Sequence, residues 1–474
     1  MKKLNKLKAL VALVSILIFT ACDTVDFGDI NTSPNSATVG STALLLTGVE
    51  RSVAGYTTQV IPNLYSQYIS EGQYPESSQY DDDTFAFSYG PFIEIQRIID
   101  LCTDPETSTN AAANGPVNNQ IAAASLLRVF FFKHMAERWG MIPYTEALQG
   151  LENTYPKYDD QLTVYKSLID EIDTALALIT DGDIEGDYIF GGDMTKWSTF
   201  GNTMKMVMAL TLSNADATTG QTAFNEAISG AISSNSENLV YPFLDDDLND
   251  NAWQDRFETR VDYLLSDTFV NALIGTGTNL APEDPRLEKM GEPALNTGVY
   301  TGAPYGAQNT ALAEYSYITS DIIYNGSREM PIYTYAQVLF ARSEAAALGW
   351  TSEDAASLYE QGISASMEQW GVNSTDADTY IAENPYTDAN DMAYEKWVAG
   401  FLMGYDTWTD WRRQKSLGYE RPLSPPAILQ GNATGIPNRH GYSTQEPLTN
   451  AENYNEAVQL QGPDDLNTIL ALFK

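Results

Sequence analysis

The chain has 474 residues, with 26 Lys and Arg against 63 Asp and Glu, and its formal net charge is −37. Such an acidic surface repels phosphate backbones, which excludes nucleic acid as a partner. Two cysteines cannot support a disulfide framework, so the fold has to be stabilised by its hydrophobic core, for which the length is ample.

The first 21 residues have the pattern of a secretory signal. An apolar run over residues 9–19 is too short to span a bilayer, and it follows four lysines, Lys2, Lys3, Lys6 and Lys8. The run ends in FTAC, with small residues before Cys22, which resembles the lipobox of bacterial lipoproteins. We therefore predict lipidation at Cys22. Cleavage after Ala21 with an incidental Cys22 is the alternative.

Removal of this leader would leave 22 basic and 63 acidic residues, a net charge of −41. Residues 22–40 are rich in Asp, Ser, Thr and Asn and predict a flexible tether. Lipidation of Cys22 would leave Cys102 as a lone thiol, so no internal disulfide is expected. We expect a single domain over residues 41–474.

Apolar residues three or four apart predict amphipathic helices over residues 121–138 and 161–180, and over the stripe from Trp197 to Met208. Residues 335–348 and 354–369 predict a helix hairpin, with Gly349 ending the first helix. The sequence TSED at 351–354 predicts a capping box for the second helix, and three alanines at 345–347 predict a close approach of the pair.

Between the helices lie stretches rich in Gly, Pro, Asn and Tyr, over residues 60–90, 236–330 and 414–465. Irregular segments of this length in a compact protein are usually functional. The sequence therefore predicts an all-α scaffold of helix hairpins with long irregular loops that bind a ligand.

Several motifs in order along the chain resemble the SusD/RagB family of nutrient-binding outer-membrane lipoproteins. They are LRVFFFKHMAERWG at 127–140, IPYTEAL at 142–148, YPKYD at 155–159, Trp197, DPRL at 284–287, MPIYTYAQVLFARSEAA at 330–346, WTDWRR at 408–413, and Ile436, Pro437 and Arg439. They span nearly the whole chain beyond the tether.

The resemblance implies a right-handed α-α superhelix of tetratricopeptide-like helix hairpins, whose loop-rich face captures a ligand. It also implies a location at the outer membrane, lipid-anchored and facing the cell exterior, with a SusC-like TonB-dependent barrel as the partner. We expect an oligosaccharide ligand. A peptide ligand, or a protein scaffold without a small ligand, is the alternative.

No catalytic constellation is evident, and we expect a binding protein rather than an enzyme. The two histidines, His134 and His440, cannot form a zinc site unaided, and His134 is interpreted as a packing or surface residue. Nucleophile-elbow, phosphate-loop and dinucleotide motifs are absent from the sequence. The WTDWRR motif, with Trp408, Trp411, Arg412 and Arg413, is interpreted as structural rather than as a ligand site.

We expect no cofactor, although one acidic stretch matches the register of a calcium loop. Its ligand positions would be Asp247, Asn249, Asn251, the carbonyl of Trp253, Asp255 and Glu258. Ala252 occupies the position that normally requires Gly. A solvated turn is the alternative interpretation of this stretch.

Ligand contact is predicted for aromatic residues in the loops, since a sugar ring offers an apolar face to an aromatic side chain. The candidates are Tyr74, Tyr80, Tyr89, Trp253, Tyr300, Tyr305 and Tyr324. Packing of each ring between loop and scaffold is the alternative.

Overall fold

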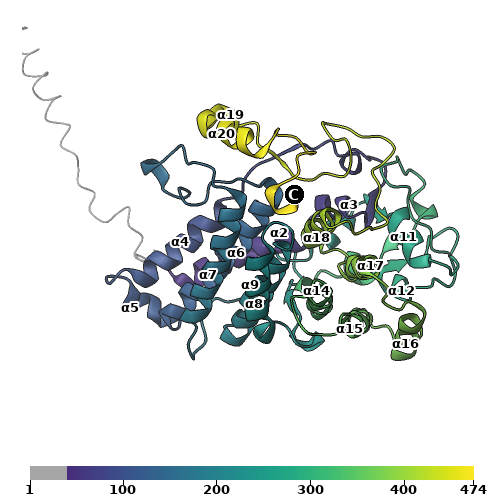
Figure 1. Ribbon diagram of the computed structural model, residues 1–474, viewed down its shortest axis with the longest axis horizontal. Coiled ribbons are helices and arrows are strands. Elements are labelled where there is room, and N and C mark those ends of the chain that lie inside the picture. Colours follow the sequence, from purple (N-terminus) through teal and green to yellow (C-terminus); the bar gives the residue numbers. More distant parts are fainter. Residues whose placement is uncertain (1–39) are drawn as a thin grey trace, which may run out of the picture. The chain divides into compact units, whose positions relative to one another are not determined.

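Helices provide most of the regular structure in the computed structural model, which describes residues 40–474 (Figure 1). The predicted signal peptide, Cys22 and almost all of the tether lie outside the described residues. Residues Thr42–Lys474 form one compact unit. The longer helices are α2 (Thr42–Thr57), α4 (Gly90–Thr103), α6 (Val117–Trp139), α7 (Gln161–Leu178), α8 (Met194–Thr211), α9 (Ala217–Ala227), α14 (Tyr335–Ala347), α15 (Ala355–Gln369), α16 (Ser374–Glu383), α17 (Ala389–Ala399), α18 (Gly404–Ser416) and α20 (Ala451–Gln461).

Short helices and two-stranded ribbons fill the segments between them. The short helices are α3 (Val60–Tyr65), α5 (Ser108–Ala111), α10 (Ala252–Phe257), α11 (Asp267–Ile274), α12 (Leu287–Met290), α13 (Ser320–Ile323) and α19 (Glu446–Thr449). Antiparallel ribbons pair β1 (Ile69–Glu71) with β4 (Tyr263–Leu265), β3 (Leu239–Tyr241) with β7 (Met330–Tyr333), and β5 (Gly291–Glu292) with β6 (Tyr317–Ile318). The parallel pair is β2 (Thr84–Phe85) with β8 (Gly441–Tyr442).

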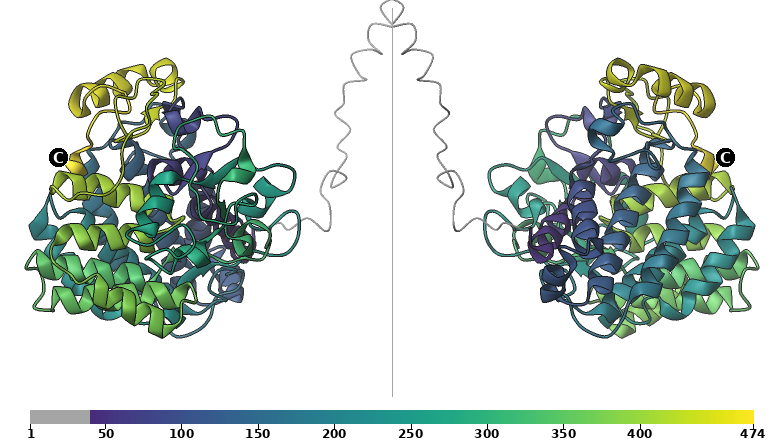
Figure 2. Two further views of the ribbon diagram at one scale, coloured as in Figure 1. Left: turned by 90° about the vertical axis from the view of Figure 1, so that its right-hand side faces the viewer. Right: turned by 90° about the vertical axis from the view of Figure 1, so that its left-hand side faces the viewer.

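Consecutive helices pack as hairpins, and the hairpins lie next to one another. Helix α6 packs on α7, α8 on α9, and α14 on α15, while α7 and α14 both contact α8. Figure 1 shows these helices side by side, and in both views of Figure 2 the yellow α19 and α20 lie above them. The predicted helical scaffold of tetratricopeptide-like hairpins is confirmed.

The hairpin of α14 and α15 was predicted correctly in its bounds but not in its details. Gly349 takes a positive φ of 74° just after α14, as a helix-ending glycine does. The N-cap of α15 is Asp354, whose side chain accepts from the Ser357 amide at 2.9 Å, so the predicted capping box at Thr351 is wrong. Gly362 contributes to the close approach of the two helices, because a Cβ there would lie 2.8 Å from the Phe340 ring.

Buried ion pairs join α14, α17 and α18. The Arg413 guanidinium contacts Glu344 at 2.6 Å and Asp410 at 3.0 Å, and the Lys396 ammonium contacts Asp410 at 2.7 Å. These positive neighbours hold the pKa of the Asp410 carboxyl well below its usual range, although burial opposes them. The rest of the WTDWRR motif is also internal, since Arg412 donates to the Glu137 carbonyl at 2.6 Å and lies over the Trp408 ring. Its interpretation as a structural motif is consistent with this packing.

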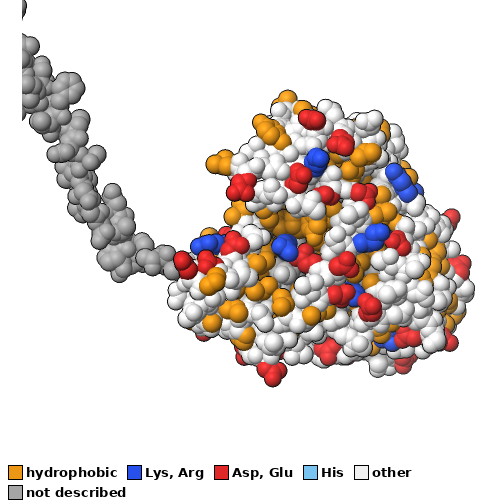
Figure 3. Space-filling view, turned by 60° about the vertical axis from the view of Figure 1, so that its left-hand side comes forward, with side chains coloured by type: hydrophobic (Ala, Val, Ile, Leu, Met, Phe, Trp, Pro, Cys, Tyr) orange, Lys and Arg blue, Asp and Glu red, His pale blue; other side chains and the backbone are white. Residues whose placement is uncertain are grey.

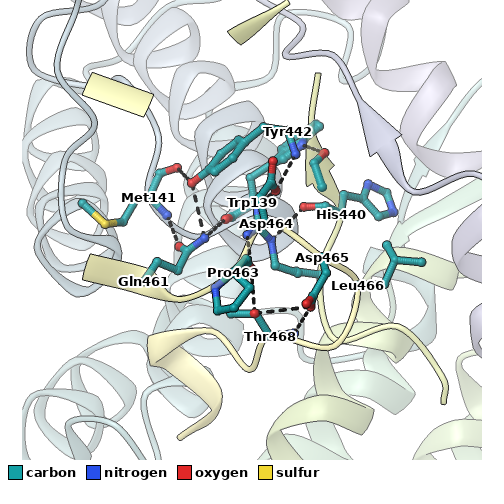
Figure 4. Close-up of polar contacts among 12 residues, drawn as sticks. Trp139, Met141, His440, Tyr442, Gln461, Pro463, Asp464, Asp465, Leu466 and Thr468 are labelled. Atoms are coloured by element: carbon teal, nitrogen blue, oxygen red, sulfur yellow. Dashed lines mark hydrogen bonds and ion pairs between the residues drawn. The ribbon is translucent and has the colours of Figure 1, made fainter. Parts of the chain in front are cut away.

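The chain's C-terminal segment is bound to the turn that follows α6. The Gln461 side chain accepts from the Met141 amide at 2.7 Å and donates to the Trp139 carbonyl at 2.9 Å (Figure 4). Gly140 lies between these two residues with a φ of 84°, and a Cβ there would lie 1.9 Å from the Gln461 amide oxygen. Only glycine fits this position, both for its backbone angle and for its space.

The long stretches between the hairpins are less irregular than predicted. Residues 236–330 contain β3, β4, β5 and β6 together with α10 to α13, and residues 414–465 contain β8, α19 and α20. Apart from α20, these elements have two to eight residues, which is too short for a period to be recognised in a sequence. Within the described residues, no helix is both long and apolar enough to cross a membrane.

Both histidines are packing residues. His134 is buried on α6 among the rings of Tyr56, Phe130 and Tyr405, with centroids 4.6–5.4 Å away. His440 is stacked on Phe85 at 3.8 Å. Burial lowers the pKa of each imidazole well below its usual value, and neighbouring cations add to this effect.

Loss of the buried Arg413 charge is expected to destabilise the protein strongly. Arg413→Met leaves Glu344 without its bidentate partner inside the core, which costs about 3–5 kcal/mol for such pairs. Arg342→Met is the control, because Arg342 lies on α14, the helix of Glu344, and its pair with Glu353 is partly exposed and worth less than about 1 kcal/mol. Urea unfolding followed by circular dichroism measures both. Equal losses of unfolding free energy in the two variants would contradict the stabilising role given to the buried Arg413 charge.

The buried His134 is expected to make the protein acid-sensitive. The His134 pKa is lowered in the folded state, so the unfolded state binds the proton first as pH falls below about 6.5. The free energy of unfolding then decreases by up to about 1.4 kcal/mol per pH unit until the pKa of the folded state is reached. His134→Leu removes this contribution. Its loss of stability between pH 8 and pH 5, measured relative to its own value at pH 8, should be smaller than that of the unmodified chain. An unchanged pH slope would show that His134 does not titrate differently on unfolding.

Candidate ligand-binding pocket

Three of the aromatic residues predicted to contact ligand are core residues instead. Tyr80, Trp253 and Tyr300 are at most 7% exposed, so none of these rings offers a face to a ligand. Tyr80 packs edge-on against Tyr65, and Trp253 lies in the first turn of α10 with its ring against Tyr263. Loop position did not predict exposure here, because the loops cover the helices with their own aromatic side chains.

The other four aromatic residues reach the surface to different extents. Tyr74 and Tyr324 are 57% and 63% exposed, so both rings lie at the surface. Tyr89 is half-buried, with its hydroxyl donating to the Pro143 carbonyl at 2.9 Å. Tyr305 is also half-buried, but its ring lines a pocket. Among the seven candidates, Tyr305 has the geometry of a ligand-contacting ring.

This pocket, called here the α11 pocket, has a volume of about 480 Å³. Its walls are the exposed side of α11, the Tyr305 segment and a proline-rich segment that follows α18. The lining residues are Asp267, Thr268, Asn271, Ala272, Tyr305, Pro422, Ser424, Pro425, Pro426 and Ala427. The pocket therefore combines an aromatic ring and proline rings with hydroxyl and amide groups.

Local hydrogen bonds hold the Tyr305 ring in place. The Tyr305 hydroxyl donates to the Leu64 carbonyl at 2.7 Å, and its backbone amide donates to the Asp267 carboxylate at 3.1 Å. Asp267 also accepts from the Thr268 amide at 2.9 Å. The one acidic group in the lining is thus used within the protein, and the ring is oriented before any ligand arrives.

Gln67 joins two walls of the pocket. This buried side chain donates to the Ser424 carbonyl at 2.5 Å and accepts from the Ser424 amide at 3.3 Å and from the Thr268 hydroxyl at 3.0 Å. Gly306 allows the proline segment to approach, because a Cβ there would lie 2.3 Å from Pro426. Sequence reasoning missed Gln67 and the proline segment. The cluster of prolines at 422–426 was the available signal for a stiff wall.

The arrangement suits the binding of a small molecule. The lining contains hydroxyl, amide and ring groups, and its one carboxylate is held by backbone amides, without a histidine or a second carboxylate beside it. A rigid ring edged by hydrogen-bonding groups is complementary to a molecule that has apolar faces and a polar rim.

The acidic stretch does not gather calcium ligands. The Asn251 side chain caps α10 by accepting from the Trp253 amide at 3.0 Å, and Trp253 is itself helical. Asp247, Asp255 and Glu258 are exposed, while Asn249 donates to Asp246. Within residues 40–474, no group of three or more Asp, Glu, His or Cys side chains could hold a metal ion. A solvated turn followed by a short helix describes this segment.

Solved structures of several proteins share the fold. A SusD homolog from Bacteroides fragilis has a TM-score of 0.78 at 23% identity, covering 92% of this chain and 100% of that one. A SusD homolog from Parabacteroides distasonis has a TM-score of 0.75 at 22% identity, covering 92% and 98%. A protein named as chitin-binding has a TM-score of 0.76 at 20% identity, covering 91% and 100%. At these sequence identities, the structural similarity shows that the proteins share a fold.

A search of curated proteins finds no match to this sequence. The profile of the SusD-like family described as "Starch-binding associating with outer membrane" matches residues 34–443, which is most of the chain. The motifs that suggested the resemblance lie in the elements that build this fold, including the buried Arg286 of DPRL and the buried Arg413 of WTDWRR. The chain therefore belongs to the SusD-like family of proteins associated with the outer membrane.

Proposed function

We propose that this protein is a non-catalytic surface lipoprotein that captures an uncharged oligosaccharide in the α11 pocket. It delivers the sugar to a TonB-dependent outer-membrane barrel. The observation that carries the proposal is the pocket of about 480 Å³ with the fixed Tyr305 ring among hydroxyl and amide groups. Membership of a family described as starch-binding supports the choice of ligand class.

The lining matches a sugar in its chemistry. One face of a pyranose ring is made of C–H groups that pack against Tyr305 and the prolines, while its hydroxyl groups bond with Thr268, Asn271 and Ser424. The net charge of −37 disfavours an anionic polymer, and acidic side chains are spread over the face shown in Figure 3. A neutral glycan meets no such repulsion.

A peptide ligand and a ligand-free scaffold are the alternatives. A peptide would be held mainly by backbone hydrogen bonds and side-chain pockets, and a scaffold would retain no small molecule. Incubation of the purified protein with panels of glycans and peptides separates the three. Retention of a glycan without cleavage supports the proposal, and cleavage would show an enzyme.

Removal of the Tyr305 ring should weaken glycan binding. For a glycan that the protein retains, Tyr305→Ala should cost on the order of 1–3 kcal/mol of binding free energy, and Asn271→Ala should weaken binding through a lost hydrogen bond. Isothermal titration calorimetry measures both.

Tyr324→Ala is the matched control for that measurement, because Tyr324 is 63% exposed and does not line the α11 pocket. Its affinity should equal that of the unmodified chain. If Tyr324→Ala or Tyr74→Ala weakens binding and Tyr305→Ala does not, the sugar binds elsewhere. The melting temperature of each variant confirms that it is folded.

Cys22 is proposed as the lipid attachment site, on the basis of its place after the apolar leader. Cys22→Ser should move the protein from the membrane fraction to the soluble fraction and abolish incorporation of labelled fatty acid. Cys102→Ser is the control, because this buried thiol lies within the domain and should leave fractionation unchanged. Continued lipid labelling of the Cys22→Ser variant would refute the assignment.

A further inference from the structure

A second pocket, called here the α2 pocket, lies between the C-terminal half of α2 and the segment from β3 to α10. Its volume is about 240 Å³, and it shares no lining residue with the α11 pocket. Its charged lining residues are Arg51 on α2, Asp250 in the acidic turn and Arg256 on α10. Two arginines facing one pocket are unusual in a chain with 63 acidic and 26 basic residues.

Neither arginine is neutralised within the described part of the chain. The Arg256 side chain donates to the Ala252 carbonyl at 3.0 Å and lies over the Trp253 ring, 5.0 Å from its centroid. No ion pair joins Arg51 or Arg256 to a carboxylate among residues 40–474, although Asp250 lines the same pocket. Burial lowers the pKa of Arg256, and the neighbouring Tyr263 and Asp255 oppose this effect only in part. The pocket therefore leaves guanidinium donors available to a ligand.

The remaining walls suit the body of a small molecule. Tyr241 and Phe243, which are 4% and 6% exposed, reach the pocket with only a small part of their rings, whose centroids are 4.7 Å apart. Leu248, which is 83% exposed, also lines it, and Thr58 and Gln59 add polar groups from the end of α2. The exposed Leu248 side chain and the accessible ring edges, beside two guanidinium groups, form a site with one charged and one apolar part.

We propose that the α2 pocket binds a singly charged carboxylate carried on a ring or a short apolar body, with Arg51 and Arg256 holding the carboxylate. Guanidinium groups pair with carboxylates through two parallel hydrogen bonds, which favours this anion over a point charge. The acidic turn and α10 beside the pocket contribute Asp247, Asp250 and Asp255, so a molecule with several negative charges is repelled. The site is independent of the glycan pocket.

The carboxylate could belong to a sugar acid or to an aromatic or aliphatic acid. Two probe compounds distinguish these two classes of ligand. Sodium glucuronate and sodium benzoate are titrated into the full-length protein at low ionic strength, with glucose and benzamide as neutral counterparts. Binding followed by calorimetry or ligand-observed NMR should occur for a carboxylate and not for its neutral counterpart. Glucuronate binding identifies a sugar acid, and benzoate binding identifies an apolar acid.

Substitutions test whether these two arginines carry the binding. Arg51→Gln and Arg256→Gln should each weaken carboxylate binding on the order of tenfold, because each removes a charge-assisted pair. Asp250→Asn should strengthen binding, since it removes a like charge from the lining. Arg97→Gln is the matched control, because Arg97 is an exposed arginine of α4 outside the pocket.

The result that overturns the proposal is equal binding of carboxylates and neutral counterparts, absence of carboxylate binding, or equal weakening by Arg97→Gln and Arg51→Gln. Arg51 is exposed, so its variant decides the outcome even if the half-buried Arg256 does not tolerate substitution. Glycan binding in the α11 pocket should be unchanged in all these variants, which keeps failure here distinct from failure of the proposed function.

Discussion

The buried pair of Arg413 and Glu344 fixes how the helices of this protein are arranged. Two hydrogen bonds of 2.6 and 2.7 Å join a guanidinium on α18 to a carboxylate on α14, and both side chains are fully buried. Such a pair is costly to desolvate and tolerates little displacement, because each lost contact leaves a charge in the core. Asp410 and Lys396 extend the network to α17, and a separate ion pair of Lys133 with Asp406 joins α6 to α18 at 2.9 Å. These ion pairs therefore favour one alignment of the helices, although the apolar faces alone could pack in several alignments.

A few hydrogen bonds connect this fixed arrangement of helices to the α11 pocket. Trp397 on α17 donates to the Ser66 carbonyl at 2.9 Å and accepts from the Tyr68 hydroxyl at 2.5 Å through its own carbonyl, so the segment carrying Gln67 is held to the scaffold on both sides. Gln67 in turn holds Ser424 and Thr268, one from each of two pocket walls. The proline segment follows α18 directly along the chain. The pocket is therefore rigid without being part of a helix hairpin, and loop residues can change there while the helices stay unchanged.

Sequence patterns predicted the parts of this protein that repeat over many residues. Helices α7 and α15 bury one long face each, and α6, α8 and α14 bury most of their residues, so their long apolar patterns are visible without any knowledge of partners. The loop aromatics were harder, because a tyrosine is suited equally to a half-wet binding site and to packing with a bonded hydroxyl. Tyr80 and Tyr305 are neighbours whose hydroxyls are 3.3 Å apart, yet one is buried and the other lines the pocket. Gln67 could not be recognised, since its role depends on residues about 200 and 360 positions away that only the fold brings together.

The two pockets differ in what they leave unpaired, and this difference indicates what each can hold. In the α11 pocket the Asp267 carboxylate is already used by the backbone amides of Thr268 and Tyr305, so the groups left for a ligand are neutral. In the α2 pocket, Arg51, Arg256 and Asp250 line one cavity without forming an ion pair with one another. Most arginines that are buried elsewhere, such as Arg286 and Arg439, contact a carboxylate at 2.6–3.0 Å. An arginine that forms no ion pair within the fold can pair fully with a ligand. The missing internal pair lowers the stability of the free protein to some extent. The neutral pocket therefore selects by shape and hydrogen bonding, while the α2 pocket selects by charge.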